Sequence, residues 1–248
     1  MKNIFKSLKK SFLRERCPTF FGFIERRLSL VNPYGLYFSA GIALSAFFFI
    51  LFLGIVQNVL SKDWIVETDA CFMNLIASLR TVTLAKFFLF FTYLGNWQFI
   101  TSLSAIIAII LFLLKERRKL VFFLTGVVGG EVLYYSLKLL FHRARPDAIF
   151  SLIIKDGYSF PSGHATMSFL FYGIVAYALF YLLKKNWQKI FLIISFSVFI
   201  FLIGFSRIYL GVHWVSDILA GWVFGAGLLV LLITFFKERE RFKPETKK

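Results

Sequence analysis

Long uncharged apolar runs alternate with short, strongly charged segments along this chain of 248 residues. An α-helix needs about 20 apolar residues to cross the hydrocarbon core of a bilayer. The uncharged run Phe87–Leu114 is too long for one span, so we expect Gly95 and Asn96 to divide it into an interfacial helix and a span. The pattern predicts six spans, in order Leu36–Val56, Trp97–Leu114, Leu120–Phe141, Pro161–Leu183, Ile190–Ser206, and a last one from near His213 or Asp217 to Phe236.

The composition of the chain is that of a membrane protein. Hydrophobic residues make up 58% of it, Phe alone accounts for 34 residues, and the mean hydropathy is +0.74. A water-soluble domain of this length does not carry so much apolar surface. The sequence therefore predicts an all-α, six-helix membrane domain at residues 35–236 and argues against two soluble domains.

The net charge of +16 is unevenly distributed along the chain. Most Lys and Arg residues lie in the N-terminal tail, the segment KERRK, the segment KKNWQK and the C-terminal tail. With six spans these four segments share one side of the membrane, which the positive-inside rule makes cytoplasmic. We expect basic cytoplasmic tails at residues 1–34 and 237–248, the first containing a helix that lies on the inner membrane surface. The charge excess is thus a topology signal and does not indicate nucleic-acid binding.

Five further basic residues are expected at the outer ends of spans or in the loop between the third and fourth spans. The positive-inside rule disfavours basic residues on that side. An anionic ligand bound at the outer face would account for them. These residues are Lys138, Arg143, Arg145, Lys155 and Arg207.

Three segments that this topology places at the outer face carry residues suited to phosphoryl transfer: KLLFHRARP, PSGH and SRIYLGVHWVSD. Lys138, Arg145 and Arg207 supply fixed positive charges, which stabilise the negative charge that a phosphoryl group spreads over its oxygens during transfer. Pro146 is expected to end the helical path and to turn Arg145 back toward the site.

The segment PSGH, residues 161–164, is expected to begin the fourth span. Pro161 suits the first turn of a helix, and the free N–H groups of a helix N-terminus favour an anion. Gly163 allows the backbone to approach a phosphate closely, and Ser162 offers a hydroxyl donor. His164 can carry a proton near neutral pH.

His213 and Asp217 are four residues apart, and therefore on one face of a helix that begins there. Asp217 can accept a hydrogen bond from one ring nitrogen of His213. The other ring nitrogen is then oriented as a nucleophile.

The order and spacing of these residues resemble the three-part signature of the type-2 phosphatidic acid phosphatase superfamily, with matches at Lys138-x6-Arg145-Pro146, Pro161-Ser162-Gly163-His164 and Ser206-Arg207-x5-His213-x3-Asp217. The resemblance covers about residues 85–236. It implies that His213 attacks phosphorus to give a phosphohistidine. It also implies that His164 protonates the leaving oxygen and then serves as the base for the attacking water.

The resemblance further implies a lipid phosphatase of the cell (inner) membrane, with its site facing the periplasm or the extracellular side. Its partners are then the bilayer and a lipid substrate. Candidate substrates are undecaprenyl diphosphate, phosphatidylglycerol phosphate, phosphatidate and lipid A phosphate. We expect no metal and no other cofactor, because the clustered cations would repel a divalent ion.

Two other functions stay open from the sequence. In a lipid phosphotransferase an acceptor hydroxyl would replace water at the phosphohistidine. A lipid-binding protein without enzymatic activity would be expected to carry a broken signature, whereas this one is unbroken.

Four residues outside the signature have open roles. Arg143 either contacts phosphate or is solvated. Glu131, inside the third span, is a functional candidate by default, although a hydrogen-bond or charge partner is the simpler explanation. Tyr158 is a candidate for the entrance of the site, and His142 for a structural role or a contact near the headgroup.

Overall fold

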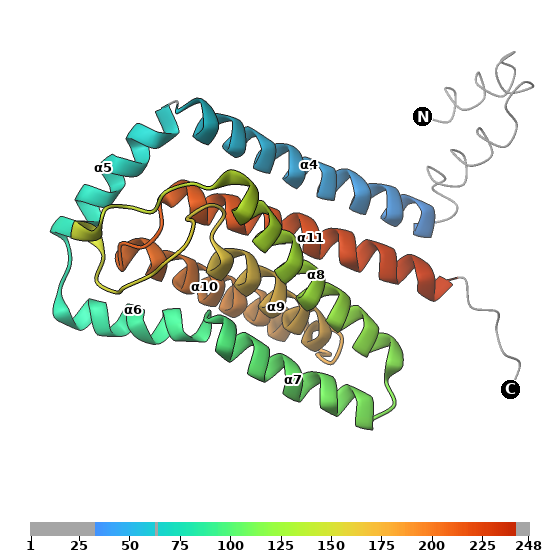
Figure 1. Ribbon diagram of the computed structural model, residues 1–248. Coiled ribbons are helices and arrows are strands. Elements are labelled where there is room, and N and C mark those ends of the chain that lie inside the picture. Colours follow the sequence, from blue (N-terminus) through green and yellow to red (C-terminus); the bar gives the residue numbers. More distant parts are fainter. Residues whose placement is uncertain (1–32, 63, 242–248) are drawn as a thin grey trace, which may run out of the picture.

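The computed structural model describes residues 33–62 and 64–241, and all regular structure within them is helical (Figure 1). The expected surface helix of the N-terminal tail and residues 242–248 of the C-terminal tail lie outside the described residues. The helices are α4 (Pro33–Ser61), α5 (Trp64–Ser78), α6 (Val82–Leu94), α7 (Trp97–Leu113), α8 (Arg117–Phe141), α9 (Gly163–Phe180), α10 (Asn186–Tyr209) and α11 (Val215–Arg241), with a short 3₁₀ helix, η1 (Ala148–Phe150), before α9.

Five of the described helices are long and apolar enough to cross a membrane, namely α4, α8, α9, α10 and α11. The pair α6 and α7 is bent by 42° at a short break and counts as a sixth span if the two helices are taken together. The break falls at Gly95 and Asn96, where the sequence predicted a division. The chain is therefore a multi-pass membrane protein with five to six candidate spans.

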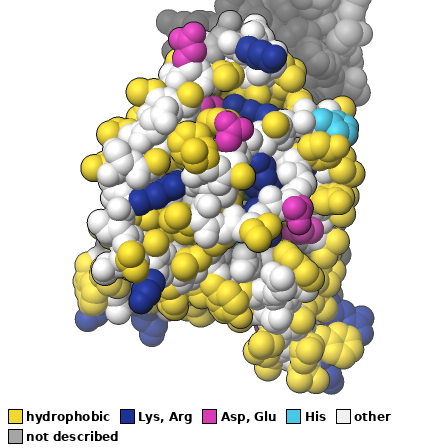
Figure 2. Space-filling view, turned by 60° about the vertical axis from the view of Figure 1, so that its left-hand side comes forward, with side chains coloured by type: hydrophobic (Ala, Val, Ile, Leu, Met, Phe, Trp, Pro, Cys, Tyr) yellow, Lys and Arg dark blue, Asp and Glu magenta, His cyan; other side chains and the backbone are white. Residues whose placement is uncertain are grey.

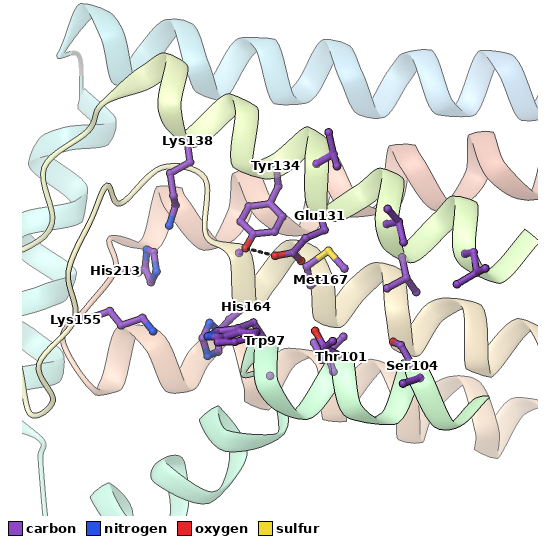
Figure 3. A pocket seen from close by; sticks show the side chains of 18 of the residues that line it. Trp97, Thr101, Ser104, Glu131, Tyr134, Lys138, Lys155, His164, Met167 and His213 are labelled. Carbon is purple, nitrogen blue, oxygen red and sulfur yellow. Dashed lines mark hydrogen bonds between the residues drawn. The ribbon is translucent and has the colours of Figure 1, made fainter. Parts of the chain in front are cut away.

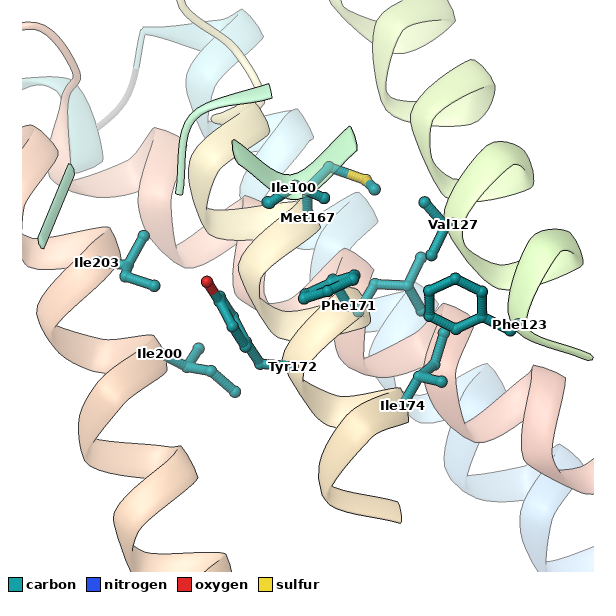
Figure 4. Packing of buried hydrophobic residues seen from close by; sticks show 10 residues of the cluster. Ile100, Phe123, Val127, Met167, Phe171, Tyr172, Ile174, Ile200 and Ile203 are labelled. Carbon is teal, nitrogen blue, oxygen red and sulfur yellow. The ribbon is translucent and has the colours of Figure 1, made fainter. Parts of the chain in front are cut away.

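Helix α9 lies at the centre of the bundle. It packs against α8, α10 and α11, while α4 lies along the outer side of α11 (Figure 1). More than half of the apolar window of α9 is buried inside the protein, whereas α4 and α10 leave most of theirs exposed, as lipid-facing helices do. Met167, Phe171 and Ile174 of α9 meet Phe123 and Val127 of α8 in the main core (Figure 4).

Two glycines of α11 allow it to approach α9 closely. A Cβ atom added at Gly221 would lie 2.8 Å from the Cβ of Ala165, and one added at Gly225 would lie 2.9 Å from the carbonyl oxygen of Thr166. Small residues at such positions let two membrane helices pack backbone to backbone.

The three helix boundaries around the site lie at the predicted positions or within two residues of them. Helix α9 begins at Gly163 rather than Pro161, because the hydroxyl of Ser162 caps it by accepting from the N–H of Ala165. Helix α8 ends at Phe141, as the sequence predicted, because His142 adopts the left-handed conformation (φ 49°) that terminates a helix. Pro146, which was expected to end the helical path, lies beyond this point. Helix α11 begins at Val215, between the two starts predicted near His213 and Asp217, so His213 precedes the helix.

The connections α5–α6, α8–α9 and α10–α11 meet at one end of the bundle (Figure 1). The α8–α9 loop is fixed on the α10–α11 turn, since the N–H of Leu152 donates to the carbonyl of Leu210 at 3.0 Å and the hydroxyl of Ser151 donates to that of Gly211 at 3.0 Å. Arg80 holds the same loop by donating to the carbonyl of Phe150. Figure 2 shows this end, with Lys and Arg side chains lying between hydrophobic ones.

Candidate active site

A cavity of about 530 Å³ brings together residues that are far apart in the sequence. Its polar end is lined by Lys138, Arg145, Lys155, His164 and His213 (Figure 3). From there it continues between α7 and α8, where most of its lining is apolar. The lining of that part includes Ile100, Ala105, Ala108, Leu124, Val127 and Val128.

His213 is held from both sides of its ring. Its Nδ1 lies 3.2 Å from Oδ2 of Asp217, and its Nε2 lies 3.2 Å from a guanidinium nitrogen of Arg145. Because Arg145 can only donate, Nε2 is the accepting nitrogen and Nδ1 carries the proton that Asp217 accepts. Although His213 precedes α11, the arrangement expected from its spacing to Asp217 is present.

The environment of His213 favours the neutral ring. Burial lowers the pKa of His213 well below its ordinary value, and the positive charges of Arg145, Lys138, Arg207 and Lys155 lower it further, in that order. At neutral pH the contact with Asp217 is therefore a hydrogen bond from a neutral imidazole rather than an ion pair.

Asp217 is fully buried and is satisfied by several donors besides His213. The N–H of Trp214 donates to Oδ2 at 2.9 Å, and the hydroxyl of Ser159 donates to the same oxygen. Arg143 donates to Oδ1 at 2.6 Å. The carboxylate is thus fixed in position on the far side of the imidazole from the cavity cations.

Arg143 adopts an arrangement that differs from both alternatives considered from the sequence. Its guanidinium bridges two buried carboxylates, Asp217 at 2.6 Å and Asp69 at 2.8 Å, and donates to the hydroxyl of Ser216 at 2.7 Å. Asp69, on α5, also accepts from the backbone N–H of Ser216 at 2.9 Å. Asp69 was not predicted as a site residue from the sequence, where its only signal was an acidic residue within an apolar stretch.

Arg145 is fixed mainly by backbone carbonyls. It donates to Gly157 at 2.9 Å, to Val212 at 2.7 Å and to Asp156 at 3.3 Å, besides its contact with His213. Burial lowers the pKa of Arg145, but a guanidinium remains protonated at any physiological pH. Arg145 therefore brings a permanent positive charge to Nε2 of His213.

Arg207, in the last turn of α10, is 1% exposed. One guanidinium nitrogen donates to the hydroxyl of Thr92, while Nε and the other terminal nitrogen are buried without a hydrogen-bond partner among the residues that the structure describes. Unpaired buried donors on a charged group are costly. An anion with several acceptor oxygens is the ligand that would satisfy them.

His164, in the first turn of α9, is positioned by the bend between α6 and α7. Its Nε2 lies 2.8 Å from the side-chain oxygen of Asn96, so Nε2–H donates to the amide. A Cβ atom added at Gly95 would lie 3.0 Å from Cδ2 of His164 and 2.4 Å from Ile203, so the bend requires a small residue there. From the sequence, Gly95 and Asn96 indicated only a break between helices.

The other candidate residues divide between the cavity and its surroundings. Gly163 and Glu131 line the cavity, and Glu131 accepts a hydrogen bond from the hydroxyl of Tyr134 at 2.9 Å, as the simpler explanation of it predicted. Ser162 is buried at the cap of α9 and is not a lining residue. Tyr158 does not line the cavity either, because its ring packs edge-on against His142 at 4.3 Å.

Comparison with known proteins agrees with this geometry. The sequence model of the PAP2 superfamily matches residues 119–241. The chain is 29% identical to phosphatidylglycerophosphatase B of Bacillus subtilis (strain 168) over 207 residues, which are 82% of this chain and 98% of that protein.

Two crystal structures resemble the chain in fold. One is the transmembrane PAP2-type phosphatidylglycerolphosphate phosphatase from Bacillus subtilis, with a TM-score of 0.69, 29% identity and coverage of 82% of this chain and 98% of that one. The other is Aquifex aeolicus LpxE, with a TM-score of 0.50, 30% identity and coverage of 64% and 92%.

Proposed function

This chain belongs to the PAP2 superfamily, and we propose that it is a membrane phosphatase that hydrolyses a lipid phosphate or diphosphate monoester through a phosphohistidine. The name of the Bacillus subtilis relative, phosphatidylglycerophosphatase B, supports a lipid phosphate as the substrate class. The observation that carries the proposal is Arg207, a buried guanidinium with two unpaired nitrogens whose charge acts on His213. Arg207 does not itself line the cavity, which holds Lys138, Arg145, Lys155 and the two histidines.

The phosphoryl group binds at the polar end of the cavity in this proposal. Lys138, Arg145 and Arg207 neutralise its equatorial oxygens. The first turn of α9, from Gly163, adds the free N–H groups of a helix N-terminus. Arg145 exchanges its contact with Nε2 of His213 for a phosphate oxygen, which frees the nitrogen for attack.

Hydrolysis then proceeds in two balanced steps. Nε2 of His213 forms a bond to phosphorus, the bond from phosphorus to the leaving oxygen breaks, and that oxygen takes a proton from the protonated ring of His164, which becomes neutral. In the second step His164 removes a proton from water, the resulting hydroxide attacks phosphorus, and the P–N bond breaks to restore His213. Asp217 stabilises the ring by holding Nδ1–H throughout.

The apolar part of the cavity accommodates the lipid tail. It runs between α7 and α8 away from the cations, so a chain lying in it would present its phosphate to His213 (Figure 3). A site that is cationic at one end and apolar along its length matches an amphipathic substrate.

The proposed topology has six spans, with α6 and α7 counted as one, and both termini in the cytoplasm. The α7–α8 and α9–α10 connections, which contain the basic segments KERRK and KKNWQK, lie at the end of the bundle opposite the cavity cations (Figure 1). This separation supports a site on the outer face. In this topology the membrane domain comprises residues 35–236, and the cytoplasmic tails comprise residues 1–34 and 237–248. Helix α11 continues into the C-terminal tail as far as Arg241.

We propose that catalysis needs no metal ion. Lys138, Arg145 and Arg207 supply the positive charge that a metal provides in other phosphatases. Within residues 33–62 and 64–241 no three His, Cys, Asp or Glu side chains are grouped as metal ligands.

The test of the proposed function is phosphate release by purified protein from a panel of lipids: phosphatidate, phosphatidylglycerol phosphate, undecaprenyl diphosphate and lipid A phosphate. We expect turnover of at least one of them in the presence of EDTA, and none by the His213→Ala variant. Binding without turnover would show a lipid-binding protein instead, and transfer of phosphate to a lipid hydroxyl would show a phosphotransferase. Activity that EDTA abolishes and a divalent ion restores would contradict the metal-free mechanism.

A further inference from the structure

Lys155 is the third basic residue that lines the cavity, besides Lys138 and Arg145, and it lies outside the three-part signature. It belongs to the α8–α9 loop and lines the same cavity as Lys138, Arg145, His164 and His213. Figure 3 shows the side chains of Lys138 and Lys155 reaching toward His213 from opposite sides. In the part of the chain that the structure describes, the Lys155 ammonium forms no hydrogen bond or ion pair, so its donors are available to a ligand.

The Lys155 ammonium points toward His164, the residue proposed to protonate the leaving oxygen (Figure 3). After burial, the pKa of His213 is lowered by Arg145, Lys138 and Arg207, and least by Lys155. Burial, followed by the charges of Arg207 and Arg145, lowers the pKa of Lys155 itself, so its ammonium still shares their surroundings.

The number of cations exceeds what one phosphate group requires. A phosphate monoester carries at most two negative charges, and Lys138, Arg145 and Arg207 already bring three positive ones. A diphosphate carries additional charge on a second phosphorus. In an in-line displacement the leaving group lies opposite the nucleophile, so this second phosphate would lie on the side of His164, toward which Lys155 points.

We infer that Lys155 binds the phosphate on the leaving side when the substrate is a lipid diphosphate, and thereby sets the preference for diphosphates over monophosphates. The inference rests on the proposed function. As Nε2 of His213 bonds to the terminal phosphorus, the bond to the bridging oxygen breaks and its electron pair remains on the departing lipid monophosphate. Lys155 neutralises that added charge, and water then cleaves the phosphohistidine.

Farnesyl diphosphate and farnesyl phosphate test this role, because they have the same tail and differ only by one phosphate group. The Lys155→Met variant keeps the length of the side chain and removes its charge. We expect kcat/KM for loss of the diphosphate to fall about 10- to 100-fold, the range for a lost charge-assisted hydrogen bond, and kcat/KM for the monophosphate to change less than about threefold. Lys155→Arg should restore most of the loss.

The matched control is Lys86→Met, which removes an exposed charge on α6 outside the cavity, and which we expect to turn over both substrates like the unaltered protein. An equal loss on both substrates in Lys155→Met, or no loss on either, would contradict the inference while leaving the phosphatase proposal intact. Unaltered protein that hydrolyses the monophosphate but not the diphosphate would overturn it as well. Unaltered protein that hydrolyses neither these probes nor the lipid panel would overturn the proposed function itself.

Discussion

A guanidinium nitrogen of Arg145 lies 3.2 Å from Nε2 of His213, the nitrogen that faces the cavity. The residue that is expected to bind phosphate thus holds the candidate nucleophile in its neutral, Nδ1-protonated form before any phosphate binds. A phosphate oxygen is a stronger acceptor for Arg than an imidazole nitrogen. Binding of the substrate would therefore release Nε2 at the moment when phosphorus comes within reach.

The buried pair of Asp69 and Arg143 leads to the first prediction, because it fixes Asp217 indirectly. Asp69→Asn removes one of the two carboxylates that Arg143 bridges. Breaking one side of a buried ion pair costs about 3–5 kcal/mol in the free energy of unfolding, so we expect a lower melting temperature in detergent. We also expect a lower kcat, because Arg143 then orients Asp217 less firmly.

A double-mutant cycle with Arg143→Gln separates this positioning role from general destabilisation. The effects of Asp69→Asn and Arg143→Gln on kcat should be strongly non-additive. The control is Asp147→Asn, which removes an exposed carboxylate from the α8–α9 loop. This loop also contains Arg143, but Asp147 makes no side-chain contact to the site. Additive effects of the two substitutions on kcat would argue against the relay from Asp69 to Asp217.

Asn96 is expected to orient His164. Asn96→Ala removes the amide that accepts from Nε2–H at 2.8 Å, so the ring loses its fixed orientation. We expect kcat to fall about 10- to 100-fold with little change in KM, the pattern of an interaction that acts in the transition state. Asn58→Ala, which removes an amide bonded only within α4, should leave both constants unchanged, and a KM effect alone in Asn96→Ala would speak against the role.

The lowered pKa of His213 predicts how activity responds to acid. Attack requires the neutral ring, which is lost only as the pH falls through the folded-state pKa. Since that pKa lies well below 6.5, the acidic limb of kcat/KM should lie below pH 6.5 after correction for ionisation of the substrate. Removing the charge of Lys155 with Lys155→Met should move the limb toward higher pH. A limb at or above pH 7 would contradict the environment described for His213.

The lowered pKa of His213 also predicts how the free energy of unfolding depends on pH. Between its ordinary pKa of 6.5 and its lowered folded-state pKa, His213 binds a proton in the unfolded chain but not in the folded one. The free energy of unfolding should therefore decrease as the pH falls below about 6.5. Melting curves of His213→Gln should show a shallower dependence on pH over that range, and an unchanged dependence would assign the effect to other groups.

Much of this arrangement could be predicted from the sequence, because the length of an apolar run and the spacing of two residues are local signals. Apolar run length predicted the spans and the division at Gly95–Asn96, and the spacing of His213 and Asp217 predicted their contact. Run length also predicted the end of α8 at Phe141, where the left-handed conformation of His142 terminates the helix. Pro146, which was expected to end the helical path, lies beyond it. Asp69 and the role of Asn96 could not be predicted, because their partners lie 147 and 68 positions away, and only packing brings them together.

The proposed topology predicts opposite labelling of two loops. Ile154, in the α8–α9 loop, is 95% exposed, and Asn186 is exposed at the start of α10. On a Cys71→Ser background, which removes an exposed native thiol, Ile154→Cys should react with a membrane-impermeant thiol reagent in intact cells. Asn186→Cys should react only after permeabilisation. The reverse pattern would place the site on the cytoplasmic face.

The most direct test of the account is to locate the covalent intermediate. Protein mixed with a substrate from the lipid panel, quenched under alkaline denaturing conditions that preserve phosphohistidine, and digested for mass spectrometry should carry phosphate on the peptide that contains His213. The label should be absent in His213→Ala, and we expect it to accumulate in His164→Ala, where the base for the attacking water is missing. Phosphate on any other residue, or turnover by His213→Ala comparable to that of the unaltered protein, would contradict the assignment of His213 as the nucleophile.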